Sequence, residues 1–131
     1  VINDAVSQKT IDGSLQIAHT SVTGLVQTVQ KVRRQINPKL KIEGILLTMT
    51  DSRTIYGQQI SNLIRQAYGK HLKVFDQTIP RSVRAAETST TGKSIFQYDP
   101  KGKVAEAYHS IAKGVLADAE KRIKRQSEQL R

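Results

Sequence analysis

Cysteine is absent from the sequence, which excludes disulfides, thiolate metal sites and a cysteine nucleophile. Long apolar runs are absent too, since none approaches the roughly 18 residues of a membrane span. Acidic residues are scarce: 11 Asp and Glu stand against 21 Lys and Arg, a formal net charge of +10. We therefore expect a cytoplasmic protein whose partner is an anion such as nucleic acid, a nucleotide or a membrane surface.

The 131 residues suit one compact domain, and a hydrophobic content of 37% can build a core. The positive charge is unevenly placed. Residues 1–30 carry one base and two acids, residues 31–100 carry 12 bases and 5 acids, and residues 101–131 carry 8 bases and 4 acids. An anionic partner is therefore expected to meet residues 31–131.

Hydrophobic periodicity predicts three helices. Residues 1–22 are polar with weak periodicity, so irregular structure or a poorly formed helix is expected there. A helical stripe then runs to Asn37-Pro38, a second occupies residues 60–67, and a third follows residues 103–119 with a charged, solvated tail at 121–125. The members of the first stripe are Leu25, Val29, Val32 and Ile36.

Two short apolar runs predict strands. Residues 41–49 and 73–79 flank the second helix, an order that suits a right-handed crossover between parallel strands. Residues 80–102 are expected to be a long connection with a weak extended segment at 94–98. The predicted fold class is α/β, with a parallel sheet flanked by helices and a long C-terminal helix. Two strands are too few for a stable sheet, so only part of an α/β layer structure is expected.

Gly92-Lys93-Ser94 imitates the end of a phosphate-binding loop. The first glycine of that motif would fall at Glu87, where a carboxylate repels phosphate, so an ordinary glycine turn is favoured. The three histidines lack metal-ligand spacing, and no Ser/His/Asp arrangement stands out. We predict no metal site and no catalytic residue in these 131 residues.

Two polar loops follow the predicted strands, at residues 50–54 and 79–84. The carboxyl ends of parallel strands share one edge of a sheet, where ligands bind. Asp51, Arg53, Arg81 and Arg84 are therefore expected to lie close together. Such a cluster suits a nucleotide, a DNA backbone or simple solvated ion pairs, and spacing alone does not choose among them.

Five segments, in the same order, resemble the ParA/Soj family of partition ATPases, which in turn are similar to MinD. They are residues 35–49 (QINPKLKIEGILLTM), 51–54 (DSRT), 79–87 (IPRSVRAAE), 92–95 (GKSI) and 98–108 (YDPKGKVAEAY). The resemblance covers about residues 24–116. It predicts a boundary after the lead-in 1–22, an ATPase-like portion at 23–120 and a basic helical tail at 121–131.

The resemblance implies a P-loop ATPase that binds ATP and Mg²⁺, dimerises around nucleotide and then binds DNA without sequence preference on the nucleoid. A ParB-type partner stimulates hydrolysis, and no membrane is involved. The matching positions imply an adenine-side wall made by Met49, Asp51, Pro80 and Arg81. They also imply DNA contacts by Arg53, Arg81 and Arg84. The tail residues are weaker DNA candidates: Lys121, Arg122, Lys124 and Arg125.

The family's phosphate loop, K-G-G-x-x-K-T/S, and its switch aspartates do not occur in these residues. Together with the start at Val1, these absences favour the interpretation that the chain is the C-terminal portion of such an ATPase. We expect that it binds no cofactor tightly and does not hydrolyse ATP by itself. A self-standing basic DNA-binding module without nucleotide function is the alternative.

Overall fold

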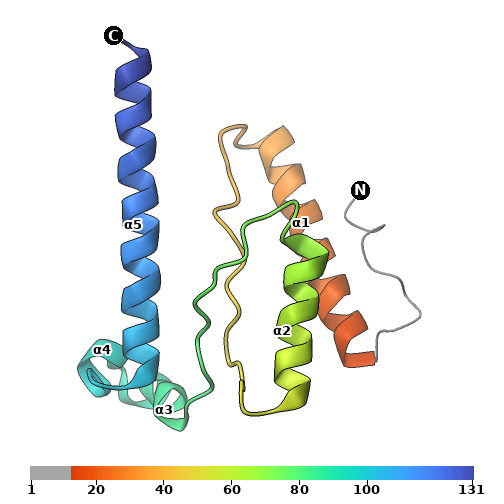
Figure 1. Cartoon of the computed structure of the whole chain (residues 1–131), viewed down its shortest axis with the longest axis vertical. Coiled ribbons are helices and arrows are strands. Elements are labelled where there is room, and N and C mark those ends of the chain that lie inside the picture. Colours follow the sequence, from red (N-terminus) through yellow and green to blue (C-terminus); the bar gives the residue numbers. More distant parts are fainter. Residues whose placement is uncertain (1–12) are drawn as a thin grey trace. The chain divides into compact units, whose positions relative to one another are not determined.

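The computed structural model describes the backbone of residues 13–131 and the side chains of residues 21–131 (Figure 1). The chain divides into two compact units. We call the first the helix-pair unit; it consists of the described part of Val1–Ile45 together with Ser52–Val74. The second, here the C-terminal unit, consists of Leu46–Asp51 and Phe75–Arg131.

The helix-pair unit contains α1 (Gly13–Gln35) and α2 (Ile55–Tyr68). The turn after α1 ends the helix as predicted: Asn37 donates its backbone N–H to the carbonyl of Val32 at 2.8 Å, and its side chain accepts from the backbone N–H of Lys39. α2 begins where the Thr54 hydroxyl accepts from the N–H of Gly57 at 3.0 Å. Both predicted helices are thus confirmed.

The core of this unit differs in part from the predicted stripe. The buried side chains are Val26 of α1 and, in α2, Ile64, Ala67 and Tyr68, the last of which has no exposed surface. The predicted members Leu25 and Ile36 are 65% and 77% exposed, so their assignment to a buried stripe was wrong. The predicted members Val29 and Val32 are half-buried, and Val26 takes the place of Leu25 on the buried face of α1.

The N-terminal lead-in is only partly described. Residues 13–22 belong to α1, so a helix and not irregular structure holds there. Residues 1–12 of that prediction lie outside the described residues. The boundaries predicted at residues 22 and 120 are tested by nothing in the structure and stay predictions.

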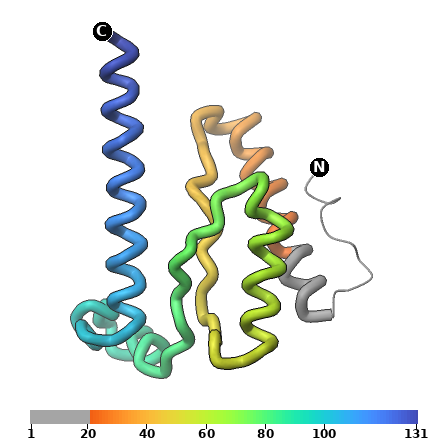
Figure 2. The backbone as a smooth tube through the Cα atoms, viewed as in Figure 1, coloured from red at the N-terminus to blue at the C-terminus, as the bar shows by residue number. Residues whose placement is uncertain are grey.

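Two chain segments run parallel where the strands were predicted. Ile45 pairs with Val74 in the helix-pair unit, and Thr50 pairs with Pro80 in the C-terminal unit. Figure 2 shows the backbone of the two segments. Five positions separate Ile45 from Thr50 while six separate Val74 from Pro80, so the register slips by one residue between the bridges. A slip of this kind interrupts the hydrogen-bond ladder.

The predicted parallel sheet is therefore not confirmed. Within the described residues the pairing consists of two isolated bridges, without a continuous strand. Met49 gives one physical reason, since its φ of 52° is left-handed and breaks the extended backbone just before Thr50. The parallel direction and the flanking helices agree with the α/β prediction, but the strands themselves do not.

The C-terminal unit contains α3 (Val83–Thr91), α4 (Ile95–Tyr98) and α5 (Lys103–Gln129). The prediction of one long connection over 80–102 was wrong, because two helices lie there. Ser82 caps α3, accepting from the N–H of Ala85 at 3.4 Å, and Gly92 ends it in the left-handed conformation that glycine tolerates, with φ 66°.

The extended segment predicted at 94–98 was also wrong. Ser94 and Gln97 form a capping box, in which each side chain bonds the other residue's backbone at 3.3–3.4 Å, so the segment turns into α4. The glycine turn predicted at Gly92 is confirmed, because it ends one helix just before the next begins.

The core of the C-terminal unit gathers around Ile79, Val104 and Ala107. Half-buried apolar side chains from each segment pack against it: Leu46, Ala85, Ile95 and Ile111. Only the first turns of α5 take part, and every residue from Glu120 to Arg131 is exposed. The long C-terminal helix and its solvated tail are thus confirmed. None of the described helices combines the length and apolar composition that a membrane crossing requires.

Candidate functional site

The two predicted loops meet at a paired edge, which we define as Met49–Asp51 with Pro80–Arg81. The N–H of Thr50 donates to the Ile79 carbonyl at 3.0 Å, and the N–H of Arg81 donates to the Thr50 carbonyl at 3.0 Å. The Thr50 hydroxyl lies 3.3 Å from the Ile79 carbonyl and 3.2 Å from the Thr78 hydroxyl. The structure thus brings Met49, Asp51, Pro80 and Arg81 together.

Met49 is the exposed apolar side chain of the paired edge. Its side chain is 76% exposed and its φ is 52°, a conformation that an unbranched L-residue adopts rarely. Pro80 is half-buried beside it in the chain pairing. An exposed thioether and a proline ring offer apolar contact without a polar group that needs a partner, which suits a flat heteroaromatic ring.

The two charged residues of the paired edge differ in whether their side chains already interact with other groups of the protein. Asp51 is half-buried and already engaged by other groups of the protein. Arg81 is exposed; its backbone is used in the pairing, and within the described residues its guanidinium makes no hydrogen bond or ion pair. Arg81 is therefore the cation at this edge that is available to an anionic ligand.

Arg53 belongs to the helix-pair unit, just before the Thr54 cap of α2. Its side chain is exposed and interacts within the protein. The Gln58 side-chain amide donates to the Ser52 carbonyl at 2.7 Å, so the loop before α2 is held to the helix it begins. The expectation that Arg53 lies beside Arg81 and Arg84 is not tested, because they belong to different units.

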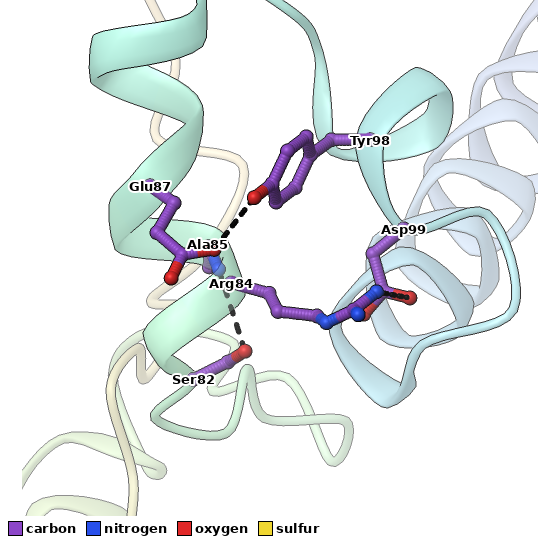
Figure 3. A network of polar contacts seen from close by, with 6 residues as sticks. All are labelled: Ser82, Arg84, Ala85, Glu87, Tyr98 and Asp99. Carbon is purple, nitrogen blue, oxygen red and sulfur yellow. Dashed lines mark hydrogen bonds and ion pairs between the residues drawn. The ribbon is translucent and has the colours of Figure 1, made fainter.

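Arg84 lies at the start of α3 and is paired across to α4. Its Nη1 is 3.3 Å from Oδ1 of Asp99, with the two side chains 63% and 21% exposed (Figure 3). The Tyr98 hydroxyl donates to Oε2 of Glu87 at 2.7 Å in the same network. These two links join α3 to α4.

The phenol in this network has an altered acidity. The hydrogen bond from its hydroxyl to Glu87 raises the pKa of Tyr98, and burial and the negative charges of Glu87 and Asp99 raise that pKa further. Arg84 opposes the effect. The protonated phenol is thus the form that holds α3 to α4.

Asp99 is held from its other side by Gly102, which precedes α5. A Cβ atom at Gly102 would collide with the Asp99 carboxylate, so the absence of a side chain there makes room for it. The carboxylate therefore lies over the start of α5, where the helix dipole favours a negative charge. Gly102 and α5 together place the group that faces Arg84.

The basic tail is not part of this cluster. Lys121 follows Lys103 by 18 residues in α5, which separates them by about 27 Å along the helix axis. The tail bases are all exposed: Lys121, Arg122, Lys124 and Arg125. A contact with DNA through both Arg84 and the tail would require a surface of that length.

Comparison with known proteins decides the family. Residues 3–95 match the CobQ/CobB/MinD/ParA nucleotide binding domain. The chain is 44% identical over 96 residues to the chromosome-partitioning ATPase Soj of Thermus thermophilus, covering 73% of this chain and 38% of that protein. The chain belongs to the ParA/Soj family of partition ATPases.

Two further ParA/Soj relatives agree. The sporulation initiation inhibitor protein Soj of Bacillus subtilis is 37% identical over 120 residues, covering 89% of this chain and 47% of that protein. The chromosome partitioning protein ParA of Caulobacter vibrioides is 38% identical over 96 residues, covering 73% and 35%. The chain thus spans less than half the length of these curated ParA/Soj relatives.

A ParA/Soj protein is expected to bind ATP and Mg²⁺, and the described residues fit one part of that requirement. Met49 is exposed and Pro80 is half-buried, and their apolar atoms would suit contact with an adenine ring. Within the described residues, no three His, Asp or Glu side chains group closely enough to hold a metal ion. The assignment of Met49 and Pro80 to adenine stays a prediction.

The sequence did not predict the contacts that surround Arg84. Asp99, Glu87 and Tyr98 make the contacts that hold Arg84 and α3 in place, yet 15 positions separate Arg84 from Asp99. No local spacing rule joins residues that far apart. The Ser94-x-x-Gln97 capping signature was readable, and it would have placed α4 and hence Tyr98.

Proposed function

We propose that this chain forms the adenine-flanking and DNA-contacting part of a ParA-like partition ATPase. The paired edge carries the proposal, because it places Met49, Pro80 and Arg81 side by side on the loops that the family resemblance assigns to the nucleotide. The relatives' names, which refer to chromosome partitioning, support the same process here. Cargo other than chromosomes, such as a plasmid, fits the same chemistry.

The DNA-contacting role rests on Arg81 and Arg84 around the start of α3. The first turn of α3 holds no acidic residue. Cations near a helix N-terminus are unfavourable by about 0.3–1 kcal/mol, so helix stability does not explain two arginines there. Neutralising DNA phosphates would give Arg81 a role, and it would add to the structural role of Arg84 in the ion pair with Asp99. Arg53, before α2, is the third proposed contact.

The remaining family properties complete the proposal. ATP-dependent dimerisation, a ParB-like partner and location on the nucleoid are proposed for the complete ATPase to which this chain corresponds. In that ATPase, the bond broken by hydrolysis is the one to the terminal phosphate of ATP. This chain's residues orient the base and attract the DNA backbone, while the phosphate-loop motif does not occur in its sequence.

Binding of duplex DNA tests the proposal directly. Arg81→Gln with Arg84→Gln removes two charges from the start of α3. We expect about tenfold or greater weakening of DNA binding, measured by fluorescence anisotropy at fixed salt. Lys103→Gln with Lys113→Gln is the matched control, since it removes equal charge from exposed sites on α5. Equal loss in both variants would show that only total charge matters and would contradict the assigned surface.

A second candidate function is a basic DNA-binding module that does not use nucleotide. It is favoured by the charge of the helix-pair unit, whose residues 13–45 and 52–74 include 9 basic and 1 acidic residue. Labelled ATP distinguishes the two. Chemical-shift changes of the Met49 and Pro80 side-chain NMR signals on addition of ATP would support the ATPase part. Tight DNA binding, with no effect of ATP on these signals, would support the module.

A further inference from the structure

The basic charge is concentrated at one end of α1 and in the turn that follows. Between residues 31 and 42 the sequence has five basic residues and no acidic one, and all five are exposed. They are Lys31, Arg33, Arg34, Lys39 and Lys41. The C-terminal unit, by comparison, carries 11 basic and 8 acidic residues. The helix-pair unit, which lacks the paired edge, therefore carries the larger positive balance.

A hollow of about 370 Å³ lies in this region, lined by Gln30, Arg33, Arg34 and Pro38. Gln30, Arg33 and Arg34 are spaced i, i+3 and i+4, so their side chains share one face of α1. Pro38, after the helix has ended, provides an apolar wall. An amide and two guanidinium groups on one face present many N–H donors toward the same hollow.

The two arginines are not engaged elsewhere in the described chain. Neither Arg33 nor Arg34 makes an ion pair or side-chain hydrogen bond with any residue whose side chain the structure describes. The end of α1 is instead closed by its backbone, because the N–H groups of Ile36 and Asn37 both donate to the Val32 carbonyl at 2.9 and 2.8 Å. Their guanidinium groups are thus available to a ligand.

The helix end itself opposes an anion, but weakly. The C-terminus of a helix has a partial charge equivalent to about −0.5. Five full positive charges within 12 residues outweigh it. Arginine also binds phosphate through a two-pronged pair of hydrogen bonds, which gives geometry as well as charge.

We propose that this hollow, which we call the α1 basic hollow, binds a backbone phosphate of nucleic acid. It gives the helix-pair unit a DNA contact of its own, separate from Arg81 and Arg84. The inference rests on the DNA binding proposed above. It adds residues that the family resemblance did not assign, and it explains why the charge lies mainly in the unit without the paired edge.

The test compares three double variants of the 131-residue chain in DNA anisotropy titrations over a range of salt. Arg33→Gln with Arg34→Gln should weaken binding about tenfold and reduce the slope of log K against log salt by about 0.9, the value for one lost phosphate contact. Arg33→Lys with Arg34→Lys should keep the slope, since the charge remains, while losing part of the affinity. The control Lys103→Gln with Lys113→Gln should change affinity less than about twofold.

Three results would decide the inference. An unchanged affinity and slope in the Arg33/Arg34 variant, with weaker binding in the Arg81/Arg84 variant, would remove the α1 basic hollow but leave the proposed function standing. The opposite pattern would support the hollow and remove the paired-edge contact. A lower unfolding midpoint without loss of DNA binding would show that the arginines only stabilise the end of α1.

The source of the phosphate is distinguished by NMR of the arginine side-chain N–H resonances. Shifts of the Arg33 and Arg34 signals with a short random-sequence duplex, larger than those with inorganic phosphate at equal phosphate concentration, support a nucleic-acid contact. Shifts with inorganic phosphate alone would show a free-anion site and contradict the proposal.

Discussion

At the scale of single residues, Met49 combines strain with exposure. Its left-handed φ of 52° costs roughly 1–2 kcal/mol for a residue with a side chain, and little burial repays it because the side chain is 76% exposed. Strained residues that persist commonly serve a site. The strain is thus a structural reason, independent of the family resemblance, to place Met49 at a ligand.

Replacing Met49 separates strain from contact. Met49→Gly should raise the free energy of unfolding by up to about 1 kcal/mol, because glycine adopts this φ without steric cost. Met49→Ala keeps the Cβ and should leave stability nearly unchanged. Both should weaken adenine-nucleotide contact by a ParA-type assembly that contains the chain. Chemical denaturation measures the free energy of unfolding, and an equal value for the two variants would contradict a strained Met49.

Asp99 is predicted to restrain Arg84. Asp99→Asn removes the carboxylate that competes with DNA phosphates for the guanidinium, so DNA affinity should rise by up to about fivefold, the scale of an exposed ion pair. Gly102→Ala should have the same direction of effect, because the new Cβ displaces the Asp99 carboxylate. A fall in DNA affinity in both variants would mean that Asp99 orients Arg84 toward DNA instead of competing for it.

The Tyr98 phenol predicts a loss of stability at alkaline pH. Its pKa in the folded chain is raised, mainly by the hydrogen bond to Glu87. A raised pKa means that the contribution is fully present below the phenol's unfolded value of about 10 and is lost as the pH rises through the higher folded value. Tyr98→Phe should remove this pH dependence, which chemical denaturation at a series of alkaline pH values measures. An equally steep loss of stability in the variant would show that the Tyr98 phenol is not its source.

At the scale of elements, periodicity predicted what was long and amphipathic. Stripes of apolar residues identified α1, α2 and α5, whose lengths are 23, 14 and 27 residues. α3 and α4 have 9 and 4 residues, and neither has a fully buried side chain. They therefore lack the apolar stripe that would have predicted them. Their signals are the caps Ser82, Gly92 and Ser94, which act through backbone hydrogen bonds and not through hydrophobicity.

Glycines at two helices predict opposite effects of one substitution. Gly92→Ala should destabilise the chain by about 1 kcal/mol, because Gly92 ends α3 with φ 66°. Gly114→Ala should stabilise it by roughly 0.5–1 kcal/mol, since Gly114 lies inside α5 with open space around its Cα. Thermal unfolding of both variants measures the difference. A destabilising Gly114→Ala would show that α5 packs against something at that point.

At the scale of the whole molecule, the candidate site was only partly within reach of the sequence. The meeting of the loops at Thr50 and Pro80 followed from the crossover rule and is confirmed. The ion pair of Arg84 with Asp99 was not foreseen, because it depends on how α4 turns. The functional assignment of these residues to adenine and DNA stays a prediction.

The whole chain is predicted not to hydrolyse ATP by itself. ATP and Mg²⁺ supplied to the 131-residue chain should give no measurable phosphate release, because phosphoryl transfer needs phosphate and metal contacts that the phosphate-loop motif provides. A malachite-green assay over hours, with a complete ParA-type ATPase as positive control, measures this. Turnover above the rate of spontaneous hydrolysis would show that other residues of the chain supply those contacts.

Pro80 has a consequence for association between chains. The hydrogen bonds around Thr50 use the carbonyl of Ile79 and the N–H of Arg81, so the pairing needs no N–H from position 80. On the opposite side of the same segment, a neighbouring chain that tried to add a β-strand would find a donor missing. Pro80 thus permits the parallel pairing on one side and discourages edge-to-edge aggregation on the other.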